Sequence, residues 1–140
     1  YVLLAEDDGD DRELLKMAFE KMAPALDARF VENGEEVLCY LHRHGRFKDE
    51  EKYPYPSLVI LDLNMPKKDG KEVLREIKTD KIHKSLPVVI LSTCEDPQEI
   101  TKCYKLGANS YVAKPFRLKD MLRSVELLND YWFKIVQLPS

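Results

Sequence analysis

The sequence has few cysteines and no long apolar segment. Its three cysteines, Cys39, Cys94 and Cys103, are odd in number and form no Cys-x-x-Cys pair, which argues against a disulfide framework and against a cysteine zinc site. No apolar stretch reaches the roughly 18 residues needed to span a bilayer, and no signal peptide is visible. These absences predict a cytoplasmic protein with no membrane partner.

The chain also lacks the excess positive charge that nucleic-acid binding requires. Its 22 lysines and arginines face 25 aspartates and glutamates, which gives a net charge of −3, so we expect no nucleic-acid partner. Hydrophobic residues make up 44% and charged residues 34% of the chain, as in globular proteins. We expect residues 1–140 to form one domain with no linker and no output domain.

Strand-like and helix-like segments alternate five times along the chain. Short apolar runs predict strands at residues 2–5, 27–31, 57–61, 87–92 and 109–113. Apolar residues at helical spacing predict helices at 10–22, from 34, at 70–79, at 97–106 and from 118. Because each crossover between parallel strands is right-handed, this alternation predicts an α/β fold, a doubly wound parallel sheet with helices on both faces.

Three features stand outside this regular pattern. Residues 44–56 are charged and contain Gly45, Pro54 and Pro56, which predicts a surface loop available to a partner. The three histidines, at positions 42, 44 and 83, are expected to be exposed near helix ends. The apolar residues of the C-terminal segment either pack on the domain or form a homodimer face, and we favour the dimer: Trp132, Phe133, Ile135, Val136 and Leu138.

Polar residues follow four of the predicted strands at the point where each strand ends. They are Glu6 and Asp7 after the first strand, Asp62 after the third, Ser92 and Thr93 at the fourth, and Lys114 after the fifth. Because the carboxyl ends of parallel strands meet at one edge of a sheet, we expect these side chains to lie together. The neighbouring Asp8, Asp10 and Asp11 are interpreted instead as turn or helix-cap residues.

Such a group of side chains suits phosphoryl transfer. Three crowded carboxylates would repel one another, and Mg²⁺, which prefers oxygen ligands and needs only one or two carboxylates, would relieve that repulsion. The ammonium of Lys114 and the hydroxyl of Ser92 would face the oxygens of an incoming phosphoryl group. Asp62 would then act as the nucleophile and become an aspartyl phosphate.

Four motifs in this order resemble those of the response-regulator receiver domains of two-component signalling. They are Leu-Leu-Ala-Glu-Asp-Asp ending at residue 8, Val-Ile-Leu-Asp-Leu-Asn-Met-Pro-Lys-Lys-Asp-Gly ending at residue 70, Leu-Ser-Thr ending at residue 93, and Asn-Ser-Tyr-Val-Ala-Lys-Pro-Phe ending at residue 116. The resemblance covers nearly the whole chain. It implies the flavodoxin-like fold, a doubly wound five-stranded parallel sheet of order 2-1-3-4-5.

The resemblance also implies a role for each site residue. Asp62 matches the phosphoacceptor and a Mg²⁺ ligand, and Glu6 and Asp7 match the acidic pair that holds Mg²⁺ directly or through water. The backbone carbonyl of Asn64 would be a further metal ligand. Lys114 matches the phosphate-binding lysine, and the peptide bond before Pro115 is expected to be cis.

The remaining implied roles concern signal output. Ser92, with Thr93 beside it, takes the position of the switch hydroxyl, and Tyr111 is expected to turn into the space that Ser92 vacates. That movement would reshape the surface of the fourth helix, fifth strand and fifth helix by a population shift between two conformers. The implied partners are a sensor histidine kinase, of phytochrome type because the long loop and the tail are similar to those of phytochrome-partner regulators, and a downstream protein or phosphotransfer partner.

Two other functions are compatible with parts of the sequence. A haloacid-dehalogenase-type phosphatase also uses a strand-end aspartate, but it needs a second aspartate as general acid where Asn64 stands. A receiver fold could also act as a binding module that no longer takes phosphate. The complete set of charged site residues argues against that module, so we predict a phosphoacceptor signalling protein rather than an enzyme acting on other substrates.

Overall fold

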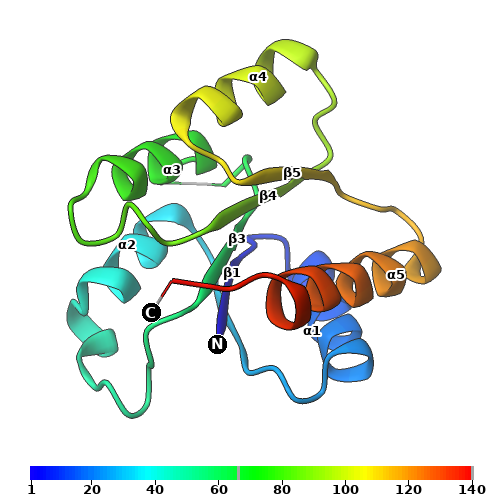
Figure 1. The fold of residues 1–140 in the computed structure, drawn as a ribbon, viewed down its shortest axis with the longest axis horizontal. Helices are drawn as coiled ribbons and strands as arrows, with labels where there is room; N and C mark the ends of the chain where they lie inside the picture. The colour runs from blue at the N-terminus through cyan, green and yellow to red at the C-terminus, as the bar shows by residue number, and fades with distance from the viewer. Residues whose placement is uncertain (66, 140) are drawn as a thin grey trace.

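The structure is a computed structural model that describes residues 1–65 and 67–139, so Pro66 of the second motif and Ser140 lie outside it. It contains one five-stranded sheet, in which every adjacent pair of strands is parallel (Figure 1). The strands are β1 (Val2–Ala5), β2 (Ala28–Val31), β3 (Leu58–Leu61), β4 (Val88–Ser92) and β5 (Ser110–Ala113). Their order is β2-β1-β3-β4-β5, which confirms the predicted topology.

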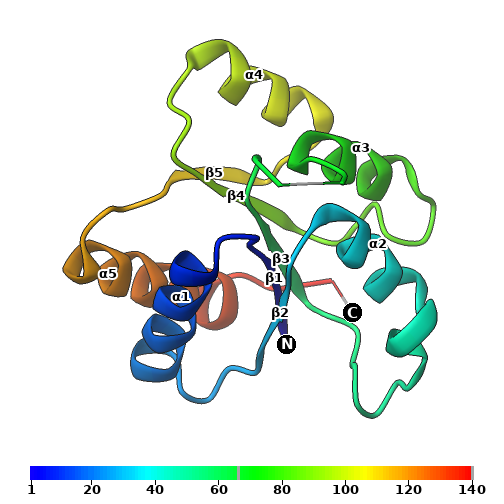
Figure 2. The same ribbon diagram turned by 180° about the vertical axis from the view of Figure 1, so that it is seen from behind.

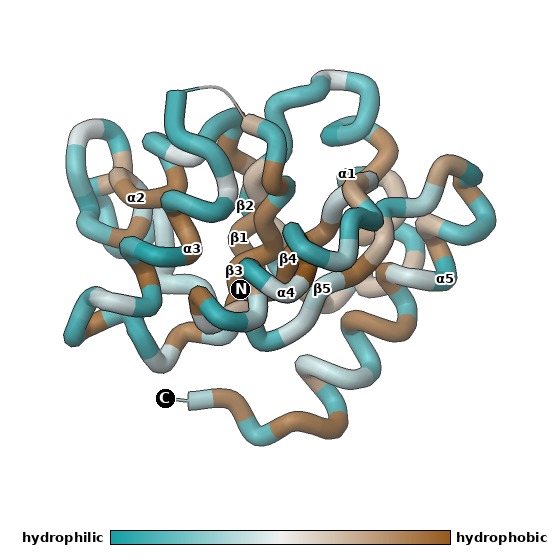
Figure 3. Tube along the Cα trace, turned by 90° about the horizontal axis from the view of Figure 1, so that it is seen from above, coloured by the Kyte–Doolittle hydropathy of each residue, from teal (hydrophilic) through white to brown (hydrophobic). Residues whose placement is uncertain are grey.

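Helices cover both faces of the sheet (Figures 1 and 2). They are α1 (Gly9–Met22), α2 (Gly34–His42), α3 (Gly70–Thr79), α4 (Pro97–Leu106) and α5 (Leu118–Asn129). Alternate residues of β1 enter two separate cores: Leu3 joins the core that α2, α3 and α4 cover, and Leu4 joins the core that α1 and α5 cover. This period of two explains why the inner strands β1 and β3 are apolar throughout, as their mostly hydrophobic traces in Figure 3 show.

Side-chain caps set where the helices that border the carboxyl edge of the sheet begin. Asp8 accepts hydrogen bonds from the backbone N–H groups of Asp10 and Asp11 at the start of α1. Asp69 accepts one from Glu72 at the start of α3. Such caps satisfy N–H groups that lack partners within the helix. They therefore hold the first turns of α1 and α3 beside the ends of β1 and β3.

The segment at residues 44–56 is more ordered than a plain surface loop. It contains a 3-10 helix (Gly45–Lys48), and the ring of Phe47 is buried against Tyr40 and Tyr53, with ring centroids 5.1 and 5.0 Å away. Tyr40 also donates a hydrogen bond of 2.8 Å to the carbonyl oxygen of Pro54. An aromatic cluster thus attaches the segment to the domain. The charged composition of the segment gave no indication of this packing.

The C-terminal segment continues α5 as a short π-helix (Asp130–Ile135) and lies largely on the domain. Trp132 is buried in the core beneath α1 and α5, and Phe133, Val136 and Leu138 pack against that core. Ile135 remains 68% exposed. Of the helices in the described ranges, none is both long enough and apolar enough to cross a bilayer.

Candidate functional site

The carboxyl ends of β1 and β3 bring three carboxylates together. Glu6 and Asp7 follow β1, Asp62 follows β3, and one oxygen from each lies within 4.8 Å of the others. Glu6 is almost fully buried, Asp62 is partly buried and Asp7 is exposed. We call these three residues the acidic pocket: they lie together, as the strand-end pattern predicted, with Glu6 innermost and Asp7 outermost.

Lys114 at the end of β5 joins the acidic pocket from the far side of β4. Its backbone N–H donates a 2.8 Å hydrogen bond to the carbonyl oxygen of Ser92, which fixes its position at the sheet edge. Its Nζ lies 3.1 Å from Asp62 Oδ2 and forms an ion pair with Glu6 Oε1. The side chain is only 5% exposed, so these contacts are shielded from water.

A fourth carboxylate contacts the same ammonium, and the sequence interpretation missed it. Asp11 Oδ2 lies 2.9 Å from Lys114 Nζ, although Asp11 was interpreted only as a turn residue. Asp8 does cap α1 as expected. The missed signal was the short connection from β1 to α1, which keeps the first turn of α1 at the same edge of the sheet.

Burial and mutual charge shift the protonation of the innermost pair. Burial raises the pKa of Glu6 from its ordinary value of 4.5 to about 7, the ion pair with Lys114 opposes that rise, and the charge of Asp62 adds to it. Burial alone would lower the pKa of Lys114, but its hydrogen bonds to Glu6 and Asp11 and the charge of Asp62 outweigh burial and raise it. The ammonium therefore keeps its charge, and Glu6 is the group that can take up a proton.

The other residues predicted for the site, the switch residues and the metal ligand Asn64, lie at differing depths. Ser92 is fully buried, and its Oγ accepts a 3.2 Å hydrogen bond from the backbone N–H of Cys94. Tyr111 donates a 2.6 Å hydrogen bond to the carbonyl oxygen of Cys94 and packs against the core. Thr93 and Asn64 are exposed, and the backbone N–H of Asn64 donates to Asp62 Oδ1 over 3.2 Å.

The expectation of a cis peptide bond before Pro115 is wrong. No peptide bond within residues 1–65 and 67–139 is cis. Lys114 reaches its carboxylate partners with the trans bond, which is the more stable isomer of an X–Pro bond by about 0.5–1 kcal/mol. The geometry of the pocket thus gives no reason for the less stable isomer.

The raised pKa of Glu6 predicts an unusual dependence of stability on pH in the presence of a metal chelator. Between about pH 4.5 and about pH 7 the folded protein holds a proton on Glu6 that the unfolded chain releases. This group's contribution to the free energy of unfolding is therefore fully present below pH 4.5 and falls as the pH rises towards 7. Urea denaturation across this range should show that the Glu6→Gln variant lacks this component, and equal slopes for both proteins would contradict the assignment.

Gly70 supports the site through close packing rather than chemistry. A Cβ atom there would overlap the carbonyl oxygen of Asp62 and lie 2.8 Å from Leu63 Cα. We expect Gly70→Ala to lower the free energy of unfolding by about 1–3 kcal/mol, because backbone must move to make room. Gly9→Ala is the matched control, since its Cβ would have no neighbour closer than Arg12 Nη2 at 3.9 Å. Equal urea midpoints for the two variants would refute this packing argument.

Comparison with known proteins places this chain in a family. A model of the response regulator receiver domain matches residues 2–126. The chain is 34% identical to the response regulator Rcp1 of Synechocystis sp. over 139 residues, which cover 99% of this chain and 92% of Rcp1. Rcp1 has been solved in a Mn²⁺-bound form, with a TM-score of 0.85 and coverage of 99% of this chain and 98% of that one.

Two further solved structures are similar over almost their whole length. One is the response regulator RPA3017 in red light signaling of R. palustris, with 38% identity, a TM-score of 0.94 and coverage of 99% of this chain and 97% of that chain. The other is the phosphorylated cyanobacterial phytochrome response regulator RcpA, with 35% identity, a TM-score of 0.91 and the same coverage. The chain belongs to the response regulator receiver domain family of signalling proteins.

Proposed function

We propose that this response regulator accepts a phosphoryl group from a sensor histidine kinase on Asp62. The observation that carries the proposal is the position of the Asp62 carboxylate, which is partly buried in the acidic pocket with Oδ2 3.1 Å from Lys114 Nζ. The ammonium holds this carboxylate in place at the sheet edge, where one of its oxygens can attack an incoming phosphoryl group. Glu6 is buried and therefore less accessible for attack, and Asp7 is not among the carboxylates that pair with Lys114.

The transfer itself would exchange one bond to phosphorus for another. An oxygen of the Asp62 carboxylate attacks the phosphorus of a phosphohistidine on the kinase. The new O–P bond forms as the P–N bond breaks, and the imidazole leaves with the electron pair of the broken bond. Lys114, already 3.1 Å from Asp62, would neutralise charge on the transferred group.

The acidic pocket fits a divalent cation, and we propose Mg²⁺. Its carboxylate oxygens are the ligands that hard cations prefer, and one oxygen from each of Glu6, Asp7 and Asp62 lies within 4.8 Å of the others. The backbone carbonyl of Asn64 would complete the protein's ligand set. When bound, the cation would neutralise the negative charge that the carboxylates and the phosphoryl group share.

Phosphorylation would then change the surface beyond Ser92. The Ser92 hydroxyl, which now accepts a hydrogen bond from Cys94 N–H, would turn towards the phosphoryl oxygens. Tyr111, held by the Cys94 carbonyl at 2.6 Å, would move with the same loop. Because both contacts involve Cys94, one local rearrangement could shift the population of conformers on the face of α4, β5 and α5.

The proposed partners follow from the similar proteins and from exposed apolar side chains. Two similar structures are regulators of red light or phytochrome signalling, so we propose a cytoplasmic kinase of phytochrome type as the phosphoryl donor. We also propose a homodimer through the C-terminal helix, where Leu127, Tyr131 and Ile135 are 49%, 53% and 68% exposed. A monomeric mass by light scattering, with and without phosphorylation, would refute the dimer.

The test of the proposed function is phosphoryl transfer measured by intact-protein mass. With Mg²⁺ and acetyl phosphate, or with a phosphorylated phytochrome-type kinase as donor, the protein should gain one phosphoryl group, and a metal chelator should prevent the gain. Failure with both donors would favour a binding module that works without phosphorylation. Steady turnover of a phosphomonoester would instead favour the phosphatase alternative.

A further inference from the structure

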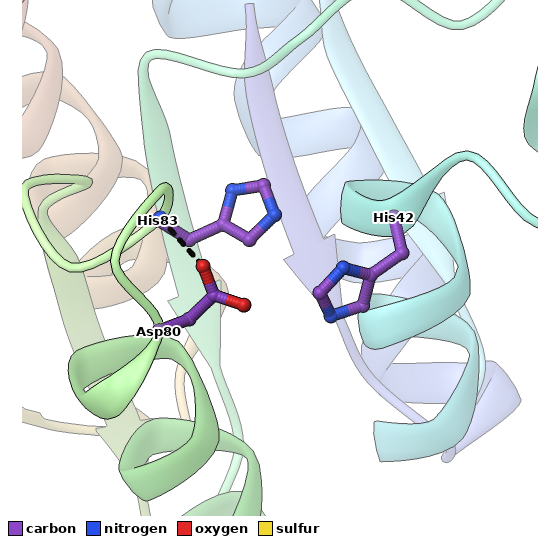
Figure 4. Close-up of side chains that lie close together, drawn as sticks. All are labelled: His42, Asp80 and His83. Atoms are coloured by element: carbon purple, nitrogen blue, oxygen red, sulfur yellow. Dashed lines mark hydrogen bonds between the residues drawn. The ribbon is translucent and has the colours of Figure 1, made fainter.

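A second group of metal-ligating side chains lies at the opposite edge of the sheet from the acidic pocket. His42 is the last residue of α2, Asp80 follows α3, and His83 lies in the connection from α3 to β4. One ligand atom from each residue lies within 4.8 Å of the others. Figure 4 shows the two imidazole rings and the carboxylate turned towards one another from these separate segments.

The prediction that His83 is exposed is wrong. His83 is only 5% exposed, and its Nδ1 is 2.6 Å from the hydroxyl oxygen of Tyr55, which leaves Nε2 for another partner. Metal-bound histidines usually donate the second ring N–H to an oxygen, which fixes the tautomer and the ring orientation. Burial also lowers the pKa of His83, which favours the neutral imidazole that a metal needs.

The carboxylate of Asp80 is held in place by its own backbone turn. Its Oδ1 accepts hydrogen bonds from the N–H groups of Ile82 at 2.8 Å and His83 at 3.2 Å. The other oxygen, Oδ2, is therefore the one available to a ligand. The backbone turn fixes the position of Asp80, and the contact with Tyr55 fixes that of His83. His42 comes from a different helix, and its ring centroid lies 5.0 Å from that of His83.

We propose that His42, Asp80 and His83 bind a divalent transition-metal cation of the zinc class. Two imidazole nitrogens and one carboxylate are typical ligands of Zn²⁺, with water in the remaining position, whereas Mg²⁺ prefers oxygen ligands. The cation would join the end of α2 to the connection between α3 and β4. This site is separate from the acidic pocket in position and in ligand chemistry.

The test is calorimetric titration with Zn²⁺ of the Asp7→Asn/Asp62→Asn variant, in which the acidic pocket has lost two carboxylates. We expect saturable binding of one Zn²⁺ per chain and a selective shift of the His42 and His83 ring signals by NMR. Adding His42→Ala should abolish this binding, because it removes one of the three ligands. The variant should still fold, because the side chain of His42 is exposed and does not contribute to core packing. Tyr55→Phe should weaken binding by about tenfold, as expected for a residue that orients a metal ligand.

Matched variants separate this site from adventitious binding. Asp80→Asn should also weaken binding although its amide oxygen can still accept both backbone hydrogen bonds. His44→Ala and Cys39→Ser, which alter nearby residues outside the cluster, should bind Zn²⁺ as the background variant does. The proposal is overturned if no saturable one-to-one binding occurs, if His42→Ala retains it, or if His44→Ala or Cys39→Ser removes it equally.

Discussion

Replacing Asp62 by asparagine should eliminate phosphoryl incorporation, even with excess acetyl phosphate and Mg²⁺. The amide keeps the size of the side chain but has no anionic oxygen to attack phosphorus. The fold should persist, because Asp62 is only partly buried and not within either core. Intact-protein mass over a time course measures the effect, and the expected result is no adduct under conditions that fully modify the unchanged protein.

Asp69→Asn is the matched control for this experiment. Asp69 lies seven positions after Asp62 and caps α3 through the N–H of Glu72 at 3.0 Å. Asparagine caps a helix about as well as aspartate. The control should therefore be phosphorylated like the unchanged protein. Comparable adduct formation by Asp62→Asn would show that another carboxylate, with Asp7 the first candidate, accepts the phosphoryl group.

Lys114→Met should produce the largest loss of stability among substitutions at the site. The change keeps the apolar stem and removes the ammonium that contacts Glu6, Asp11 and Asp62. Removing one partner of a buried ion pair typically costs about 3–5 kcal/mol, because the remaining charge is left without compensation. Urea denaturation near pH 8 with a chelator present should show a loss in this range.

The pH dependence of that loss identifies its cause. Glu6, with a pKa already raised to about 7, can take up a proton when the ammonium is absent. The loss of stability caused by Lys114→Met should therefore be smaller near about pH 5, where Glu6 is protonated and its uncompensated charge disappears. Lys71→Met is the control, since the Lys71–Glu99 pair at 2.5 Å is solvent-accessible and should matter far less. A loss that is independent of pH would indicate lost packing instead.

Local sequence patterns predicted most of the fold and the centre of the site. Continuous apolar runs identified the five strands to within one residue at each end, because strands covered on both faces tolerate few polar residues. The strand-end positions of Glu6, Asp62 and Lys114 predicted their contact, because parallel strands start and end at common edges. Neither inference required knowledge of how distant side chains pack.

The sequence by itself determined the alternation of strands and helices, the sheet order through the family resemblance, and the meeting of acidic and basic groups at one edge. Only the tertiary structure decided that Asp11 contacts Lys114, that His83 is buried beside Tyr55, and that the bond before Pro115 is trans. Each of these depends on contacts between segments that are distant along the chain or on the choice between two allowed backbone isomers. Local sequence propensity predicts neither the long-range contacts nor the choice of isomer, because the energies that decide them arise only when the segments pack together.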